Sequence, residues 1–211
     1  MNTRTKTQQM VGTAVLIALV VVLQVVASSI PWPFSFKPTF ALIPVIIGAI
    51  LYGPATGALL GFVFGAVVTA SVVSGADVGG AMMLAQNPVA TVAICLGKST
   101  IAGFVSGIVA HKLSSKNMTL SVILAALLTP VCNTGVFVLG VSLFFLDLIQ
   151  SWAGDQAVGS FIVFGLVGVN FLFEVLFDII LAPIIIRIIG AININICPIF
   201  QACSNYIKRF S

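Results

Sequence analysis

Long apolar runs of about 20 residues, separated by short polar segments, constrain this chain more than any other feature. A bilayer core about 30 Å thick is crossed by roughly 20 helical residues, which satisfy their own backbone hydrogen bonds. Charged residues make up only 7% of the chain, whereas a soluble domain carries about 25%. The sequence therefore predicts an all-α integral membrane protein.

Six transmembrane helices fit into the 211 residues. A cytoplasmic N-terminal segment at 1–10 is expected to precede a six-helix membrane domain at 11–190, and a cytoplasmic or interfacial tail to follow at 191–211. The predicted spans are Val11–Ser29, Ala41–Leu51, Ala55–Val73, Val89–Ala110, Thr119–Leu146 and Gly159–Ile189.

Basic residues are distributed unevenly between the two sides of the predicted bundle. With the N-terminus inside, Lys37 is the sole basic residue of the outer segments. Because Lys and Arg are enriched in cytoplasmic loops, both termini are expected in the cytoplasm. The net charge of +4 then reports orientation, and no nucleic-acid partner is expected. The basic residues on the cytoplasmic side are Arg4, Lys6, Lys112, Lys116, Arg187, Lys208 and Arg209.

Glycine and proline distinguish the segments around the second and third spans. Ile30–Phe40 holds three prolines and four aromatic residues, so we expect a stiff, non-helical connector or a lid. Ser74–Asn87 is Gly-rich and is predicted to be flexible, as a plain connector or a gate. Asp147–Val158 is predicted to be a polar loop. Small residues at four-residue spacing in the third span predict close packing against a neighbouring helix, and these residues are Gly57, Gly61 and Gly65.

Polar side chains at comparable depth in three predicted spans form the candidate site. Lys98, Asn133 and Glu174 lie in the fourth, fifth and sixth spans. A charge at membrane depth costs about 2.5–3.5 kcal/mol, so such groups favour one another or a shared wet cavity. Two interpretations remain open. One is a structural Lys98–Glu174 ion pair with Asn133 between the two, and the other is an outward-opening pocket for a polar small molecule.

In the pocket hypothesis each polar group has a role. Lys98 would hold an anionic group such as a carboxylate, while Asn133 and Asn170 suit amides and hydroxyls. Glu174 would accept from hydroxyl or amine groups or hold Lys98 in place, and Asp178 lies deeper, in a structural position. The remaining candidates for the substrate-binding site are Thr129, Phe137, Gln86, Asn87 and Trp152.

Motifs of catalysis, metal binding and nucleotide hydrolysis are absent from the sequence. It contains neither a zinc-protease motif nor a nucleophile elbow, and the single histidine, His111, falls at the cytoplasmic edge. Gly97-Lys98-Ser99 lacks the earlier glycine of a phosphate-binding loop. The cysteines show no metal or disulfide spacing. We therefore expect no enzymatic activity and no cofactor.

Several of these features together resemble the substrate-binding S component of energy-coupling factor (ECF) vitamin transporters. They are the short-looped spans, the proline-rich and Gly-rich outer loops, and Ala14 and Ala18 at four-residue spacing. Ile43–Gly65, IPVIIGAILYGPATGALLGFVFG, is similar to the family's LGPxxGxxxGxxxG-like stretch, with Tyr52 in place of the usual aliphatic residue. The resemblance covers about Val11–Gly190.

The resemblance implies a subunit of a bacterial cell-membrane transport complex. Such a subunit binds a vitamin from outside, topples in the membrane and releases the vitamin inside. Ala14 and Ala18 would form the docking face for the transmembrane T component, and two ATP-binding-cassette ATPases would hydrolyse ATP.

The ligand and the mode of transport have alternatives. Pro130–Gly140, PVCNTGVFVLG, and the Asn170/Glu174 pair resemble pantothenate-type S components, which makes pantothenate the expected vitamin. Hydroxymethylpyrimidine, pyridoxine and cobalamin are alternative ligands. A different alternative is a stand-alone secondary transporter that uses Glu174 and Asp178 for proton coupling.

Overall fold

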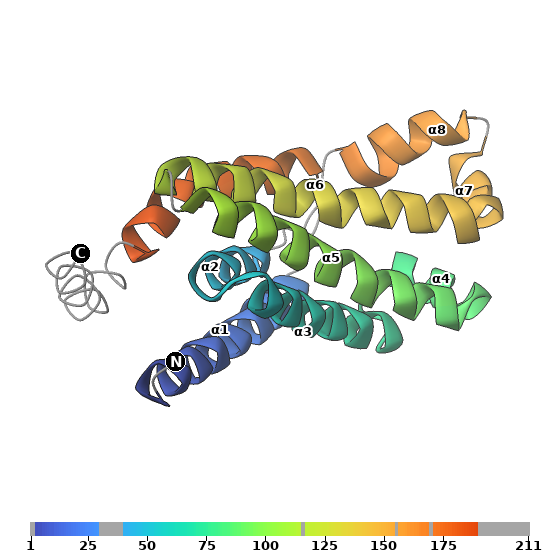
Figure 1. Cartoon of the computed structure of the whole chain (residues 1–211). Coiled ribbons are helices and arrows are strands. Elements are labelled where there is room, and N and C mark those ends of the chain that lie inside the picture. Colours follow the sequence, from blue (N-terminus) through green and yellow to red (C-terminus); the bar gives the residue numbers. More distant parts are fainter. Residues whose placement is uncertain (1–2, 30–39, 115–116, 155, 169–170, 190–211) are drawn as a thin grey trace, which may run out of the picture.

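A computed structural model describes residues 3–29, 40–114, 117–154, 156–168 and 171–189. Every regular element within these ranges is a helix, which confirms the all-α prediction. The helices are α1 (Thr3–Ser29), α2 (Leu42–Tyr52), α3 (Pro54–Val73), α4 (Val78–Gln86), α5 (Pro88–Ser114), α6 (Met118–Phe144), α7 (Leu146–Ala153), α8 (Val158–Ser160), the π-helix η1 (Phe161–Gly168) and a helix over 171–189 (Figure 1).

Four of the described helices are long and apolar enough to cross a membrane, and α2 is a shorter apolar helix. The chain is therefore a multi-pass membrane protein. The prediction of six spans with both termini in the cytoplasm stays a prediction, and the tail at 191–211 lies outside the described residues. The four long candidate spans are Lys6–Ser29, Pro54–Val73, Pro88–Leu113 and Met118–Phe144.

The backbones of α3 and α5 are in direct contact along the glycine face of α3. A Cβ atom on Gly61 would collide with the carbonyl oxygen of Ser99, and one on Gly65 would lie 2.6 Å from the carbonyl oxygen of Cys95. One turn before Gly61 in α3, Gly57 faces Gly103 in the same way. The close packing predicted from the glycine spacing is confirmed, with α5 as the neighbour.

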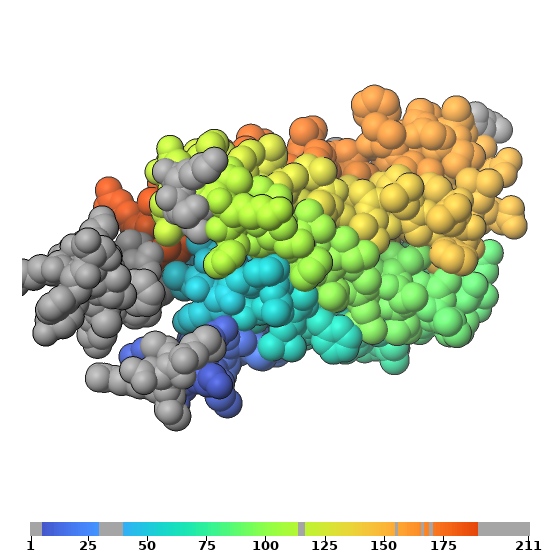
Figure 2. All heavy atoms as spheres, in the orientation of Figure 1, coloured from blue at the N-terminus to red at the C-terminus, as the bar shows by residue number. Residues whose placement is uncertain are grey.

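Three apolar clusters stabilise the remaining helix contacts. Near the start of α1, isoleucines of α2 pack with Val122 of α6 and with Ala182, Ile185 and Ile189 of helix 171–189. A second cluster joins α1, α2 and α3 around Leu42 and Leu60. The third cluster lies at the other end of the molecule, where α4 and α7 meet the ends of α5 and α6 (Figure 2).

Two expected loops are helices instead. In Ser74–Asn87 the side chain of Asp77 accepts a hydrogen bond from the Gly80 N–H at 3.2 Å and caps α4. In the predicted polar loop Asp147–Val158, α7 forms because Ile149 is fully buried in the third cluster. Packing on one helix face outweighs the glycine and polar residues that predicted loops.

Within the last predicted span, Gly159–Ile189, the described residues form α8, then the π-helix η1, and then the helix over 171–189. That these elements make up one span stays a prediction. A π-helix has i→i+5 hydrogen bonds and therefore changes the face on which later residues emerge. Most of the proline-rich segment Ile30–Phe40 lies outside the described residues.

Candidate ligand-binding site

Lys98 of α5 and Phe137 of α6 form the contact at the centre of the predicted site. The Lys98 Nζ atom lies 4.9 Å from the centroid of the Phe137 ring. An ammonium over an aromatic face is attracted by the ring quadrupole, by about 0.5–2 kcal/mol depending on exposure. Both side chains are half-buried, so the ring holds the ammonium near the α5–α6 interface.

Asn133 lies one helical turn before Phe137 on α6 and meets α5 at the residue next to Lys98. The Ser99 hydroxyl donates a hydrogen bond to Asn133 Oδ1 at 3.4 Å. Ser99 is 0% exposed and Asn133 6% exposed. Ser99 was missed by the sequence reasoning, which considered it only as part of a rejected phosphate-loop motif. The available signal was its position beside a membrane-embedded lysine.

Thr129 continues the same face of α6 one turn further on. Its hydroxyl donates to the backbone carbonyl of Ala125 at 2.7 Å, and the residue is fully buried. The proton of this hydroxyl is therefore used within α6. A ligand at Thr129 would find only the oxygen lone pairs.

Asp178 lies on the buried face of helix 171–189. It is 2% exposed, and its Oδ2 atom has no hydrogen-bond partner within the described part of the chain. Helical spacing puts it on the face that also carries Ala182, Ile185 and Ile189. The half-buried Glu174 lies one turn earlier, and its pairing with Lys98 stays a prediction. Asn170 lies outside the described residues.

Gln86, Asn87 and Trp152 lie at the α4/α7 end, about three turns along α5 from Lys98. Asn87 Oδ1 accepts from the Ala90 N–H at 3.1 Å and so caps α5. Gln86 is exposed at the end of α4. Trp152 packs in the third cluster, close to α4. These three residues lie at the end of the bundle. Closer to its middle, Lys98 contacts Phe137 and Asn133 contacts Ser99.

Comparison with known proteins decides the family. The family of the ECF transporter, substrate-specific component, matches residues 8–186. The chain belongs to this family. The family consists of substrate-binding subunits of transporters, which agrees with a polar site between apolar helices.

One relative of this S component is the pantothenic acid transporter PanT of Lactococcus lactis subsp. cremoris (strain MG1363). The two sequences are 45% identical over 65 residues. The match covers 29% of the S component and 33% of PanT, so the chain spans about a third of the length of this relative.

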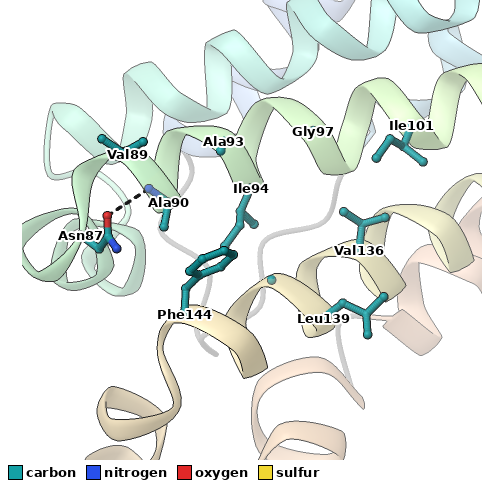
Figure 3. A pocket seen from close by; sticks show the side chains of 11 residues that line it. Asn87, Val89, Ala90, Ala93, Ile94, Gly97, Ile101, Val136, Leu139 and Phe144 are labelled. Atoms are coloured by element: carbon teal, nitrogen blue, oxygen red, sulfur yellow. Dashed lines mark hydrogen bonds between the residues drawn. The ribbon is translucent and has the colours of Figure 1, made fainter.

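A groove of about 560 Å³ lies between α5 and α6 of the S component (Figure 3). Ile94, Leu139 and Phe144 point into it, and Gly97 forms part of its α5 side. Leu139 and Phe144 are exposed, so the groove opens on the apolar surface of the protein. Of the predicted site residues that the structure describes, Asn87 alone lines it. The groove is therefore separate from the contacts of Lys98 and Asn133.

Ala14 and Ala18 are exposed on α1, as are the neighbouring Val15 and Val22. Most of α1 is uncovered by the other described helices. In its most apolar stretch only 22% of the residues are buried. This face leaves room for another helix at close range. Its role as a docking face for a partner stays a prediction.

Proposed function

We propose that this S component binds pantothenate from outside the cell and delivers it across the bacterial cell membrane. The observation that carries the proposal is a pair of contacts between α5 and α6, of Lys98 with Phe137 and of Ser99 with Asn133. The partial match to a pantothenic acid transporter supports the same ligand.

The chemistry of pantothenate fits this pair of side chains. The vitamin carries a carboxylate, an amide and hydroxyl groups. Lys98 supplies a positive charge for the carboxylate, and a charge-assisted hydrogen bond is about twice as strong as a neutral one. Asn133 supplies an amide for the amide or hydroxyl groups. Glu174 and Asn170 would complete the site from the last span.

Transport requires energy that we assign to partner subunits. A transmembrane T component would dock on the exposed α1 face around Ala14 and Ala18, and two ATP-binding-cassette ATPases would hydrolyse ATP. After docking, the S component would topple in the membrane and open its site to the cytoplasm.

A ligand panel tests the binding step directly. The purified S component is heated in mild detergent with pantothenate, hydroxymethylpyrimidine, pyridoxine or cobalamin. A ligand at 100 times its Kd stabilises a folded protein by about 2.7 kcal/mol, so pantothenate should raise the melting temperature by several degrees. A shift with another vitamin alone would reassign the ligand, and no shift with any of them would refute vitamin binding.

Co-purification tests the transport step. Gentle solubilisation from the native membrane should recover the S component together with a T component and ATPase subunits. Proton-driven pantothenate uptake by the chain reconstituted alone would instead support a stand-alone transporter and would refute the complex.

A further inference from the structure

We propose that Ser99 is a positioning residue that orients the Asn133 amide, so that Asn133 and Lys98 both present hydrogen-bond donors to the ligand from the α5–α6 wall. This inference rests on the proposed function, because it takes the ligand to lie beside Lys98 and Asn133. It identifies the ligand edge at this wall as one that carries acceptor oxygens, such as a carboxylate with a neighbouring carbonyl or hydroxyl oxygen.

The first step of the argument is the direction of the hydrogen bond. The Ser99 Oγ–Asn133 Oδ1 distance is 3.4 Å, and the bond joins two helices. The carbonyl and amino groups of a carboxamide lie on opposite sides of its Cγ atom. With Oδ1 turned toward Ser99, the Nδ2 group of Asn133 is turned away from Ser99 and presents its two N–H donors elsewhere.

The second step is that burial restricts the alternatives. Ser99 is 0% exposed and Asn133 6% exposed, so bulk water cannot replace the hydroxyl as a partner of Oδ1. A buried amide oxygen without a donor is costly. Ser99 Oγ also lies 3.4 Å from the carbonyl oxygen of Cys95, so its single proton is shared between that carbonyl and Asn133 Oδ1. The shared bond ties the hydroxyl to its own helix while it faces the amide oxygen.

The third step concerns the neighbours of Asn133 on the same wall. Lys98 precedes Ser99 in α5, and its ammonium is held over Phe137 at 4.9 Å. An ammonium donates hydrogen bonds and accepts none. Thr129 donates its proton to the carbonyl of Ala125 and offers a ligand only its oxygen lone pairs. The ammonium and the oriented amide both select acceptor groups, and an amine placed between these two would meet two donors.

A double-mutant cycle tests the positioning role. The Kd for pantothenate is measured by calorimetry for the wild type, Ser99→Ala, Asn133→Ala and the double variant. Loss of a hydrogen bond to a buried group reduces an equilibrium constant by about 5- to 30-fold, so Ser99→Ala should raise the Kd by about that factor. In the Asn133→Ala background the same change should alter the Kd less than about twofold. Equal factors in both backgrounds would overturn the proposal.

Ser106 provides a matched control. It is also 0% exposed on α5, and its hydroxyl donates to the Gly103 carbonyl of its own helix. Ser106→Ala removes a buried hydroxyl without touching Asn133 and should leave the Kd unchanged. Ser99→Ala should also weaken the binding of pantothenate and of its neutral alcohol analogue by the same factor, since the carboxylate is bound by Lys98. A selective loss of pantothenate would contradict a role through Asn133.

A ligand-free measurement separates this inference from the proposed function. Without ligand, the melting-temperature changes of Ser99→Ala and Asn133→Ala should be less than additive, because each removes the same hydrogen bond. Additive changes would overturn the inference whichever vitamin binds. If the panel reveals a different vitamin, the same cycle is run with that vitamin. Coupled melting without pantothenate binding would uphold the Ser99–Asn133 hydrogen bond and refute pantothenate as the ligand.

Discussion

The ammonium of Lys98 and the ring of Phe137 face each other across the α5–α6 interface, with 4.9 Å between Nζ and the ring centroid. The charge of Lys98 is therefore held by an aromatic face, which carries no charge of its own to neutralise the ammonium. The N–H groups that point away from the ring can donate to an anionic ligand.

Lys98→Met should separate the charge of Lys98 from its bulk. The variant keeps an apolar chain over Phe137 and loses the ammonium, which contributes about 1.5–3 kcal/mol to a hydrogen bond with an anion. The Kd for pantothenate should rise by about 10- to 150-fold, while the Kd for the neutral alcohol analogue should change little. Calorimetry on the purified chain measures both.

Lys112→Met is the matched control for that experiment. Lys112 lies on the same helix in its last turn and is exposed, so its loss should leave both affinities unchanged. Equal weakening of the two ligands by Lys98→Met would assign Lys98 a structural role and would favour the ion-pair interpretation.

Gly61→Ala should weaken the α3–α5 contact. The added methyl group would meet the Ser99 carbonyl oxygen, and because that atom is backbone, one helix must move. Overpacking of this kind costs about 1–3 kcal/mol, and the melting temperature should fall by several degrees.

Gly135→Ala gives the opposite expectation and serves as the control. Apart from its own turn of α6, no part of the described chain lies within 4 Å of a Cβ atom placed on Gly135. Alanine in place of a helical glycine should stabilise by about 0.5–1 kcal/mol. Equal melting curves for the two variants would contradict a backbone contact at Gly61.

Asp178→Asn should preserve both folding and uptake by the complete transporter. The amide has nearly the same shape as the carboxyl, and Oδ2 of Asp178 makes no hydrogen bond to any described residue. Stability should change by less than about 1 kcal/mol, whereas Ile185→Ala on the same buried face should cost about 2–5 kcal/mol. Uptake into vesicles measures the transport activity of the Asp178→Asn variant, and melting curves measure the stability of both variants. Abolished uptake in a well-folded Asp178→Asn variant would support proton coupling through this residue.

Bulky residues at Ala14 and Ala18 should block assembly without affecting ligand binding. Ala14→Leu with Ala18→Leu fills the small-residue face on which we expect the T component to dock, and both positions are exposed. Co-purified T component should fall several-fold, while the Kd for the vitamin stays constant. The control is Ala66→Leu, at an exposed alanine of α3, which should leave assembly intact. Unchanged recovery of the complex would place the docking face elsewhere.

The long apolar helices were predictable because hydrophobicity alone specifies them. The apolar runs that form α1, α3, α5 and α6 are long enough to be predicted as membrane helices without knowledge of their neighbours. The shorter elements depend on tertiary contacts instead. In α4 a glycine pair lowers helix propensity, and Met83, buried in the third cluster, helps to hold the helix. In α7 the polar Asp147 obscured the apolar face formed by Ile149 and Ala153.

The sequence predicted how deep in the membrane the polar residues lie, but not which of them are in contact. Lys98 and Asn133 were identified because a polar group in hydrocarbon is costly in free energy and requires a partner. Ser99 carries no such cost, because its hydroxyl can bond to its own helix, and only its contact with Asn133 distinguishes it. The π-helix at Phe161–Gly168 leaves no periodic signal in an apolar run. The facing of the residues that follow it could not be read from their spacing.

The glycine contacts between α3 and α5 have a mechanical consequence. Where Gly57 meets Gly103 and Gly61 meets Ser99, no layer of side chains separates the two backbones. Packed helices shift relative to each other when the side chains between them change rotamer. At these glycine contacts there are no such side chains. Helices α3 and α5 therefore behave as one rigid unit, and this unit carries Lys98 and Ser99. Any opening of the ligand site must then come from helices that move relative to α3 and α5.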